Sequence, residues 1–183
     1  MLYSFDVILK YDDYYEFNKF HMFNTAKGKK SLLFLRLYIP AILFIFLLFR
    51  TVSNFTFEIF LIDLSVNLII SAAWILVVKP LGIMILKLHL SAAKKKGTMI
   101  YDELSMVEFY DDYIRETTAD RTTELKYSSI KEVYENEGKA VYIYQNAIMA
   151  YIIPVALFSS AEEKKAFIDF IIKKIQSNKE NNQ

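Results

Sequence analysis

The segment SLLFLRLYIPAILFIFLLF, residues 31–49, decides the architecture of this chain. Its only charged residue is Arg36, which lies near the start. An α-helix of this length spans about 28 Å, close to the hydrocarbon thickness of a bilayer. The long stem of Arg36 allows its guanidinium to reach the interface. We therefore expect residues 31–49 to form a transmembrane helix.

A second apolar segment, IFLIDLSVNLIISAAWILVV, covers residues 59–78. Trp74 lies near its far end, as expected for a side chain of the interfacial aromatic belt. The apolar sequence continues past Pro80 to Leu90. It predicts a second helix that runs on into the cytoplasm, a second span shifted by several residues, or a separate interfacial helix over residues 81–93. Residues 31–96 are therefore predicted to form a two-helix hairpin with a juxtamembrane helix.

Composition supports a membrane protein and excludes several chemistries. The chain is 54% hydrophobic, above the usual range of soluble domains, and has no cysteine. Disulfides, thiolate metal sites and a cysteine nucleophile are excluded. Residues 1–99 contain 12 Lys and Arg against 6 Asp and Glu, whereas residues 100–183 contain 10 against 15. The acidic C-terminal half argues against binding to nucleic acid, which requires a basic surface.

The positions of the basic residues predict the orientation in the membrane. Arg50 is the one basic residue between the two spans. The others near the hairpin lie on the opposite side of the two spans. Those at or before the start of the first span are Lys27, Lys29, Lys30 and Arg36, and those after the second span are Lys79, Lys87, Lys94, Lys95 and Lys96. By the positive-inside rule, we expect a protein of the cell membrane with both termini in the cytoplasm.

Residues 1–30 precede the hairpin and are predicted to contain a strand and an amphipathic helix. Alternating Phe5, Val7 and Leu9 indicate a short strand over residues 3–9, with an imperfect alternation at Ile8. If residues 97–183 do not fold alone, this strand is the expected additional edge of their sheet. Asp12 is the expected N-cap of the following helix, because its carboxylate can accept a hydrogen bond from a free backbone N–H.

Residues 97–177 are predicted to form a soluble α+β domain. Six short strands alternate with turn residues, which indicates an antiparallel sheet or a half-open barrel. They are expected over residues 99–110, 113–118, 121–127, 131–137, 140–144 and 148–153. Ser159 or Ser160 is predicted to cap a final helix, whose apolar face is Ala166, Phe167, Phe170, Ile171 and Ile175. Residues 178–183 read as a polar tail.

Several short motifs, in this order and spacing, resemble the YcxB-like family of bacterial membrane proteins. They are Tyr11-Asp12-Asp13-Tyr14, Val107-Glu108-Phe109-Tyr110-Asp111-Asp112, Tyr127-Ser128-Ser129-Ile130-Lys131-Glu132-Val133 and Ala150-Tyr151-Ile152-Ile153-Pro154. The resemblance implies a pleckstrin-homology-like C-terminal domain, meaning a curved antiparallel sheet closed by a helix, and implies no established reaction. Family members often carry basic residues after the Ile-Pro step, whereas Val155 and Ala156 stand there in this chain.

Asp63 and Asn67 are the candidate intramembrane site. They are four residues apart on one helix face, which Ser71 continues. One interpretation is an ion or proton path, which two spans can form only in an oligomer. The other, which we favour, is a helix–helix contact in which Asn67 bonds across the hairpin. The charge of Asp63 would then be hydrated near the outer interface or paired with Arg50.

Lys94, Lys95 and Lys96 are candidate contacts to anionic lipid, although the topology alone also requires positive charge there. The sequence shows no Gly-rich phosphate loop, nucleophile elbow or zinc motif, so we predict no catalytic residue, cofactor or metal. The favoured function is a non-enzymatic binding or regulatory module at the inner membrane face, with the bilayer and a protein partner of residues 97–183 as its contacts. There are two alternatives. One is a transport subunit, which would have to be oligomeric, and the other is a membrane immunity protein.

Overall fold

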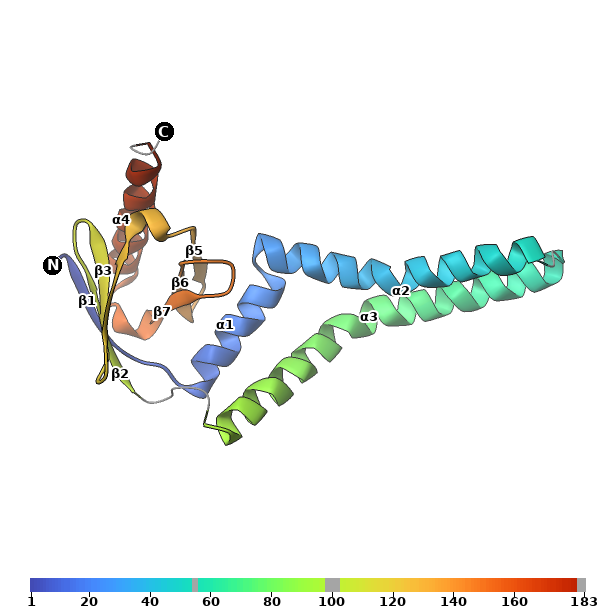
Figure 1. Ribbon diagram of the computed structural model, residues 1–183, viewed down its shortest axis with the longest axis horizontal. Helices are drawn as coiled ribbons and strands as arrows, with labels where there is room; N and C mark the ends of the chain where they lie inside the picture. The colour runs from blue at the N-terminus through green and yellow to red at the C-terminus, as the bar shows by residue number, and fades with distance from the viewer. Residues whose placement is uncertain (54–55, 98–102, 181–183) are drawn as a thin grey trace. The chain divides into compact units, whose positions relative to one another are not determined.

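The computed structural model describes residues 1–53, 56–97 and 103–180 of the chain (Figure 1). The chain divides into two compact units. One consists of residues 18–96 and contains the hairpin, while the other joins residues 1–17 to residues 97–183. Each unit is described separately below.

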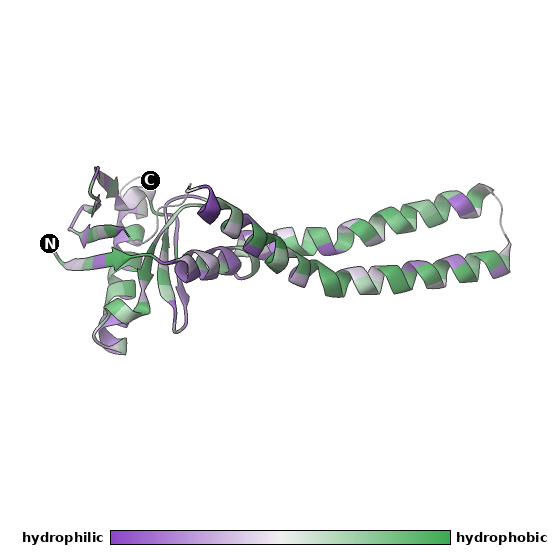
Figure 2. Cartoon of the chain, turned by 90° about the horizontal axis from the view of Figure 1, so that it is seen from below, coloured by the Kyte–Doolittle hydropathy of each residue, from purple (hydrophilic) through white to green (hydrophobic). Residues whose placement is uncertain are grey.

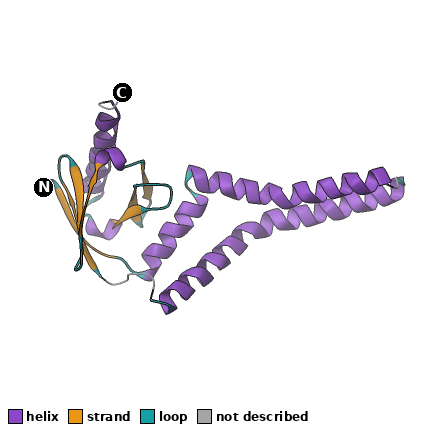
Figure 3. Cartoon of the chain, viewed as in Figure 1, coloured by secondary structure: helices purple, strands orange, loops and turns teal. Residues whose placement is uncertain are grey.

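Two long helices, α2 (Ala26–Ser53) and α3 (Phe57–Lys95), lie side by side in the hairpin unit (Figures 1 and 3). Both contain the predicted spans, and both are long and apolar enough to cross a membrane. The helix α3 is continuous through Pro80. The apolar sequence after residue 78 is thus a continuation of the second span, and the separate interfacial helix over residues 81–93 is wrong.

The hairpin leaves its apolar surface uncovered. Only 6% of the most apolar window of each helix is buried inside the protein. Phe46, Phe49 and Leu76 are each more than 70% exposed, and hydrophobic residues follow both helices along their length (Figure 2). In water such a surface is unfavourable by about 25 cal/mol per Å². These helices therefore differ from the core helices of a soluble fold, and lipid is the environment that suits them.

A close junction joins the helix α1 (Tyr11–Phe23) to α2. The Thr25 hydroxyl donates to the carbonyl of His21 at 2.8 Å and accepts from the backbone N–H of Gly28 at 3.0 Å. Thr25 therefore caps α2. A Cβ atom at Gly28 would lie only 2.2 Å from the His21 carbonyl oxygen. Glycine is required there because the two helices approach each other through their backbones.

The second unit contains two antiparallel sheets and the final helix. The first sheet has the order β1-β2-β3-β4 and the second the order β5-β6-β7. Their bounds are β1 (Tyr3–Ile8), β2 (Leu104–Phe109), β3 (Tyr113–Thr117), β4 (Thr122–Lys126), β5 (Glu132–Asn136), β6 (Ala140–Tyr144) and β7 (Ala150–Pro154), and α4 (Ala161–Glu180) follows. Short 3-10 turns precede β5 and α4. The expected antiparallel sheet structure is confirmed, and the two sheets are not closed into a barrel.

The N-terminal strand is an edge of the first sheet. β1 pairs with β2, with Phe5 opposite Val107 and Val7 opposite Ser105. Phe5 and Val7 point into the core, whereas Ile8 is 47% exposed. The side chains of the strand therefore alternate between core and solvent through Ile8, which is an apolar residue at a solvent-facing position. Residues 1–17 thus belong with the C-terminal part of the chain, although residues 18–96 separate them in sequence.

Aromatic rings fill the core of this unit. The ring of Phe167, from α4, lies 5.2 Å from that of Phe5, 4.8 Å from that of Phe109 and 5.4 Å from that of Phe158. Ile171 and Ile175 continue the buried face of α4. The buried face of α4 therefore packs against both the N-terminal strand β1 and the strand β2, and this packing holds the unit together.

Several local expectations differ from the structure. Asp12 does not cap α1; the helix begins at Tyr11, and Asp13 accepts from the backbone N–H of Lys10 at 2.8 Å. Ala166 is exposed, although its neighbours on the expected face are buried or half-buried. α4 continues to Glu180, past the predicted start of the tail. The part of the first predicted strand over residues 99–102 lies outside the described residues.

Candidate functional site

The predicted polar face of α3 lies against α2. Its residues are half-buried: Asp63, Asn67, Ser71 and Trp74. Their immediate neighbours in sequence are exposed, with the exception of the half-buried Leu64. The Nε atom of Arg50 in α2 lies 3.1 Å from the Oδ2 atom of Asp63, which is one of the two arrangements expected from the sequence. The Asp63 side chain is 20% exposed and that of Arg50 is 61% exposed. The charge of Asp63 is therefore compensated at the end of the hairpin where the two helices connect.

Asn67 bonds within its own helix. Its Nδ2 donates to the carbonyl of Asp63 at 2.9 Å. Its Oδ1 is buried and has no hydrogen-bond partner in the described part of the chain. The expected bond from Asn67 across the hairpin is therefore not formed, because the backbone carbonyl one turn away satisfies the amide first.

The hydrogen bond across the hairpin comes from Trp74 instead. Its indole Nε1 donates to the carbonyl of Leu35 at 2.8 Å. The sequence placed Trp74 at the interface but gave no partner for it. Pro40 does not provide the signal, because the carbonyl that a helical proline leaves without its usual partner is the one four residues earlier, that of Arg36.

The basic cluster Lys94, Lys95 and Lys96 lies at the end of α3. All three side chains are exposed, and the backbone N–H of Lys96 closes the last turn on Ala92 at 3.1 Å. Positive charge at a helix C-terminus is favourable because of the helix dipole. This accounts for the cluster locally, and the contact with anionic lipid stays a prediction.

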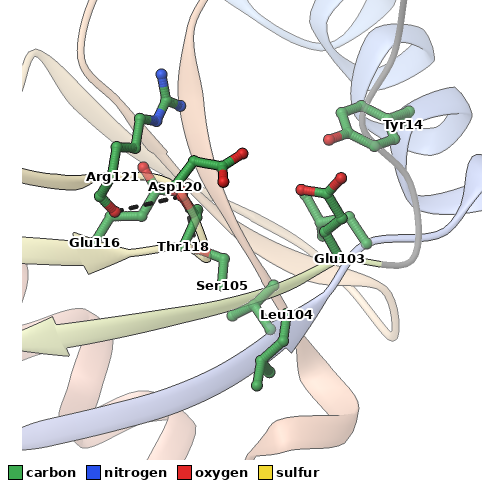
Figure 4. Close-up of a pocket in the computed structure, with 10 residues that line it drawn as sticks. Tyr14, Glu103, Leu104, Ser105, Glu116, Thr118, Asp120 and Arg121 are labelled. Atoms are coloured by element: carbon green, nitrogen blue, oxygen red, sulfur yellow. Dashed lines mark hydrogen bonds between the residues drawn. The ribbon is translucent and has the colours of Figure 1, made fainter. Parts of the chain in front are cut away.

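A pocket in the sheet unit was not anticipated from the sequence. It measures about 310 Å³ and lies among β1, the start of α1, β2 and the β3–β4 hairpin (Figure 4). We call it the β1–α1 pocket. Its lining residues are Val7, Leu9, Tyr14, Glu103, Leu104, Ser105, Glu116, Thr118, Asp120 and Arg121.

Two hydrogen bonds order the walls of the β1–α1 pocket. Ser105 donates its hydroxyl to Glu116 at 2.9 Å, across the β2–β3 pair. Thr118 closes the β3–β4 turn by donating its backbone N–H to the carbonyl of Arg121 at 2.9 Å. The turn therefore holds Asp120 in a defined position at one wall.

The charges of the pocket also act on a tyrosine in the core. The pKa of Tyr151 is raised to about 12: burial is the largest cause, the Glu116 carboxylate also raises the pKa, and the Arg121 guanidinium lowers it. Both charged groups are therefore close enough to influence the core beside the pocket.

Sequence reasoning missed this pocket because its walls are far apart in the chain. Val7 and Tyr14 come from the N-terminal segment, while Glu116 and Asp120 lie more than 100 residues later. Only the pairing of β1 with β2 brings them together. The predicted strand over residues 3–9 was the one available signal, since a strand needs a sheet to join.

Comparison with known proteins identifies the C-terminal part of the chain. Residues 109–171 match the YcxB-like protein family. The predicted resemblance is confirmed for these residues, which contain most of the C-terminal motifs. No curated protein and no solved structure gives a match.

The YcxB-like segment runs from the end of β2 into α4. It contributes Glu116, Thr118, Asp120 and Arg121 to the β1–α1 pocket. The other wall, including Tyr14 and Glu103, comes from outside the matched residues. The pocket is thus a joint product of the YcxB-like segment and the N-terminal strand and helix.

Proposed function

We propose that this protein is a membrane-anchored, non-enzymatic binding module. The hairpin crosses the membrane with both termini in the cytoplasm, and the sheet unit binds its partner at the inner membrane face. The observation that carries the proposal is the difference between the two units. The helices of one unit expose an apolar surface, whereas the other unit has its own buried core and a pocket lined by charged and apolar side chains.

The arrangement of the polar face favours an anchor over a transport subunit. The Asp63 carboxylate is paired with Arg50, and the amide of Asn67 is engaged with the α3 backbone. Polar groups within a membrane usually mark a pathway when they face a water-filled cavity. Here they face the neighbouring helix, as residues of a packing contact do.

The order of elements supports a pleckstrin-homology-like unit. Antiparallel strands are followed by one C-terminal helix whose buried face, formed by Phe167, Ile171 and Ile175, covers the core. This arrangement gives a rigid frame with open sheet edges and loops, which suits the binding of a protein segment better than the enclosure of a reaction.

A flux assay tests the anchor proposal. The full chain is reconstituted into liposomes, and proton and cation flux are measured for the wild type, Asp63→Asn and Asn67→Leu. We expect flux equal to that of empty liposomes in all three cases. The hairpin should lose little stability in Asp63→Asn. A flux in the wild type that disappears in Asp63→Asn, with thermal stability in detergent retained, would make this a transport protein instead.

A further inference from the structure

We infer that the β1–α1 pocket binds an organic cation, an ammonium or guanidinium group carried on an apolar stem. The inference rests on the proposed binding function and specifies its ligand chemistry. It is carried by the side chains that face the pocket and by its size.

Negative charge dominates the lining of the pocket. Glu103, Glu116 and Asp120 oppose a single cationic side chain, Arg121. Figure 4 shows the carboxylates of Asp120 and Glu103 turned toward the same space, with the Tyr14 hydroxyl beside them, while the Arg121 guanidinium points away. Within the residues that the structure describes, neither Glu103 nor Asp120 has an ion-pair partner. A cation placed between them would gain attraction from both carboxylates.

The remaining lining is apolar and suits a hydrocarbon stem. Of its apolar lining residues, Val7 is almost fully buried, Leu9 is half-buried and Leu104 is exposed. A lysine, arginine or alkylamine stem can lie along such a surface while its charged end contacts the carboxylates.

A metal ion fits this site less well. Among the residues described, no three His, Cys, Asp or Glu side chains gather closely enough to hold one. Calcium and magnesium require six or more oxygen ligands at about 2.0–2.6 Å. The pocket of about 310 Å³ is instead within the usual range of sites for small organic groups.

The cationic group has two natural sources, a basic side chain of a protein segment and a free amine. Two probes separate them. N-acetyl-arginine methylamide represents the side chain on a peptide backbone, and spermidine represents the free amine. N-acetyl-norleucine methylamide has the apolar stem without the charge and serves as the neutral control.

The test uses the full chain in nanodiscs of zwitterionic lipid, which does not itself attract the probes. Binding of each probe is measured by calorimetry for the wild type and for Asp120→Asn, Glu103→Gln and Arg121→Gln. We expect one cationic probe to bind and the neutral control not to bind. Each carboxylate substitution should weaken binding by about two- to fivefold, and their combination by about tenfold, as expected for partly exposed charge pairs. Arg121→Gln should strengthen binding, because it removes a like charge.

Asp112→Asn is the matched control. Asp112 is an exposed carboxylate in the β2–β3 turn, at the other end of these strands from the pocket, and its substitution should leave binding unchanged. Equal binding by Asp112→Asn and Asp120→Asn, weaker binding by Arg121→Gln, or no binding of either cationic probe would overturn the inference. Because binding is read directly, such a result would leave the flux assay, and hence the anchor proposal, untouched.

Discussion

Substitution of Phe5 by alanine tests whether the N-terminal strand belongs to the C-terminal unit. Phe5 is 5% exposed, and its ring lies 5.0 Å from that of Phe158 and 6.0 Å from that of Phe109. Truncation of a buried phenylalanine costs about 3–5 kcal/mol, from lost burial and the cavity left behind. At the lower limit, the population of the unfolded unit rises by a factor on the order of 100.

Hydrogen–deuterium exchange of the full chain in nanodiscs measures this effect. Amides of β2 and β6 that exchange only through unfolding of the unit should exchange on the order of 100-fold faster in Phe5→Ala. Ile8→Ala is the matched control, because Ile8 is in the same strand and 47% exposed. It should change exchange by no more than about twofold. Wild-type exchange rates in Phe5→Ala would refute the pairing of β1 with the rest of the unit.

Three further predictions concern single side chains. Gly28→Ala should prevent the α1–α2 junction from forming and lower the thermal stability of the chain in detergent, because the new Cβ would lie 2.2 Å from a backbone atom. Gly82→Ala is the control and should be tolerated, because its Cβ would contact only side chains, at 3.6 Å. Trp74→Phe should weaken hairpin packing by about 0.6 kcal/mol, the average for an interhelical hydrogen bond in a membrane, measured by unfolding in mixed detergent. The contribution of Tyr151 to the stability of the sheet unit should be constant below about pH 10, the unfolded pKa of tyrosine. It should then fall toward pH 12, because Tyr151 keeps its proton in the folded state; this loss should be smaller in Tyr151→Phe.

The sequence predicted the features that depend on local patterns. The two spans were evident from their long apolar segments. Their connected ends made Arg50 one of the two expected ways to compensate Asp63, the other being water, and the structure shows the ion pair. The cap of α4 was also correct, since Glu163 donates its backbone N–H to the Ser160 hydroxyl at 3.1 Å. In each case the deciding residues lie within one or two elements.

Features that depend on long-range pairing were not predicted. The alternation in β1 indicated a strand that could add an edge to the C-terminal sheet, but not that β2, which begins about 100 residues later, is its partner. The division of the seven strands into two sheets was not predicted either. The β1–α1 pocket was therefore invisible in the sequence, since it exists only after both ends of the chain have come together.

Labelling of single cysteines tests the central claim most directly. The chain contains no cysteine, so Thr56→Cys, before α3, and Ser177→Cys, near the end of α4, each introduce a unique thiol. Intact cells are treated with a membrane-impermeant maleimide before and after permeabilisation. The anchored module with cytoplasmic termini predicts that Thr56→Cys is labelled in intact cells and that Ser177→Cys is labelled only after permeabilisation. Labelling of Ser177→Cys in intact cells, or the same labelling of both positions, would contradict it.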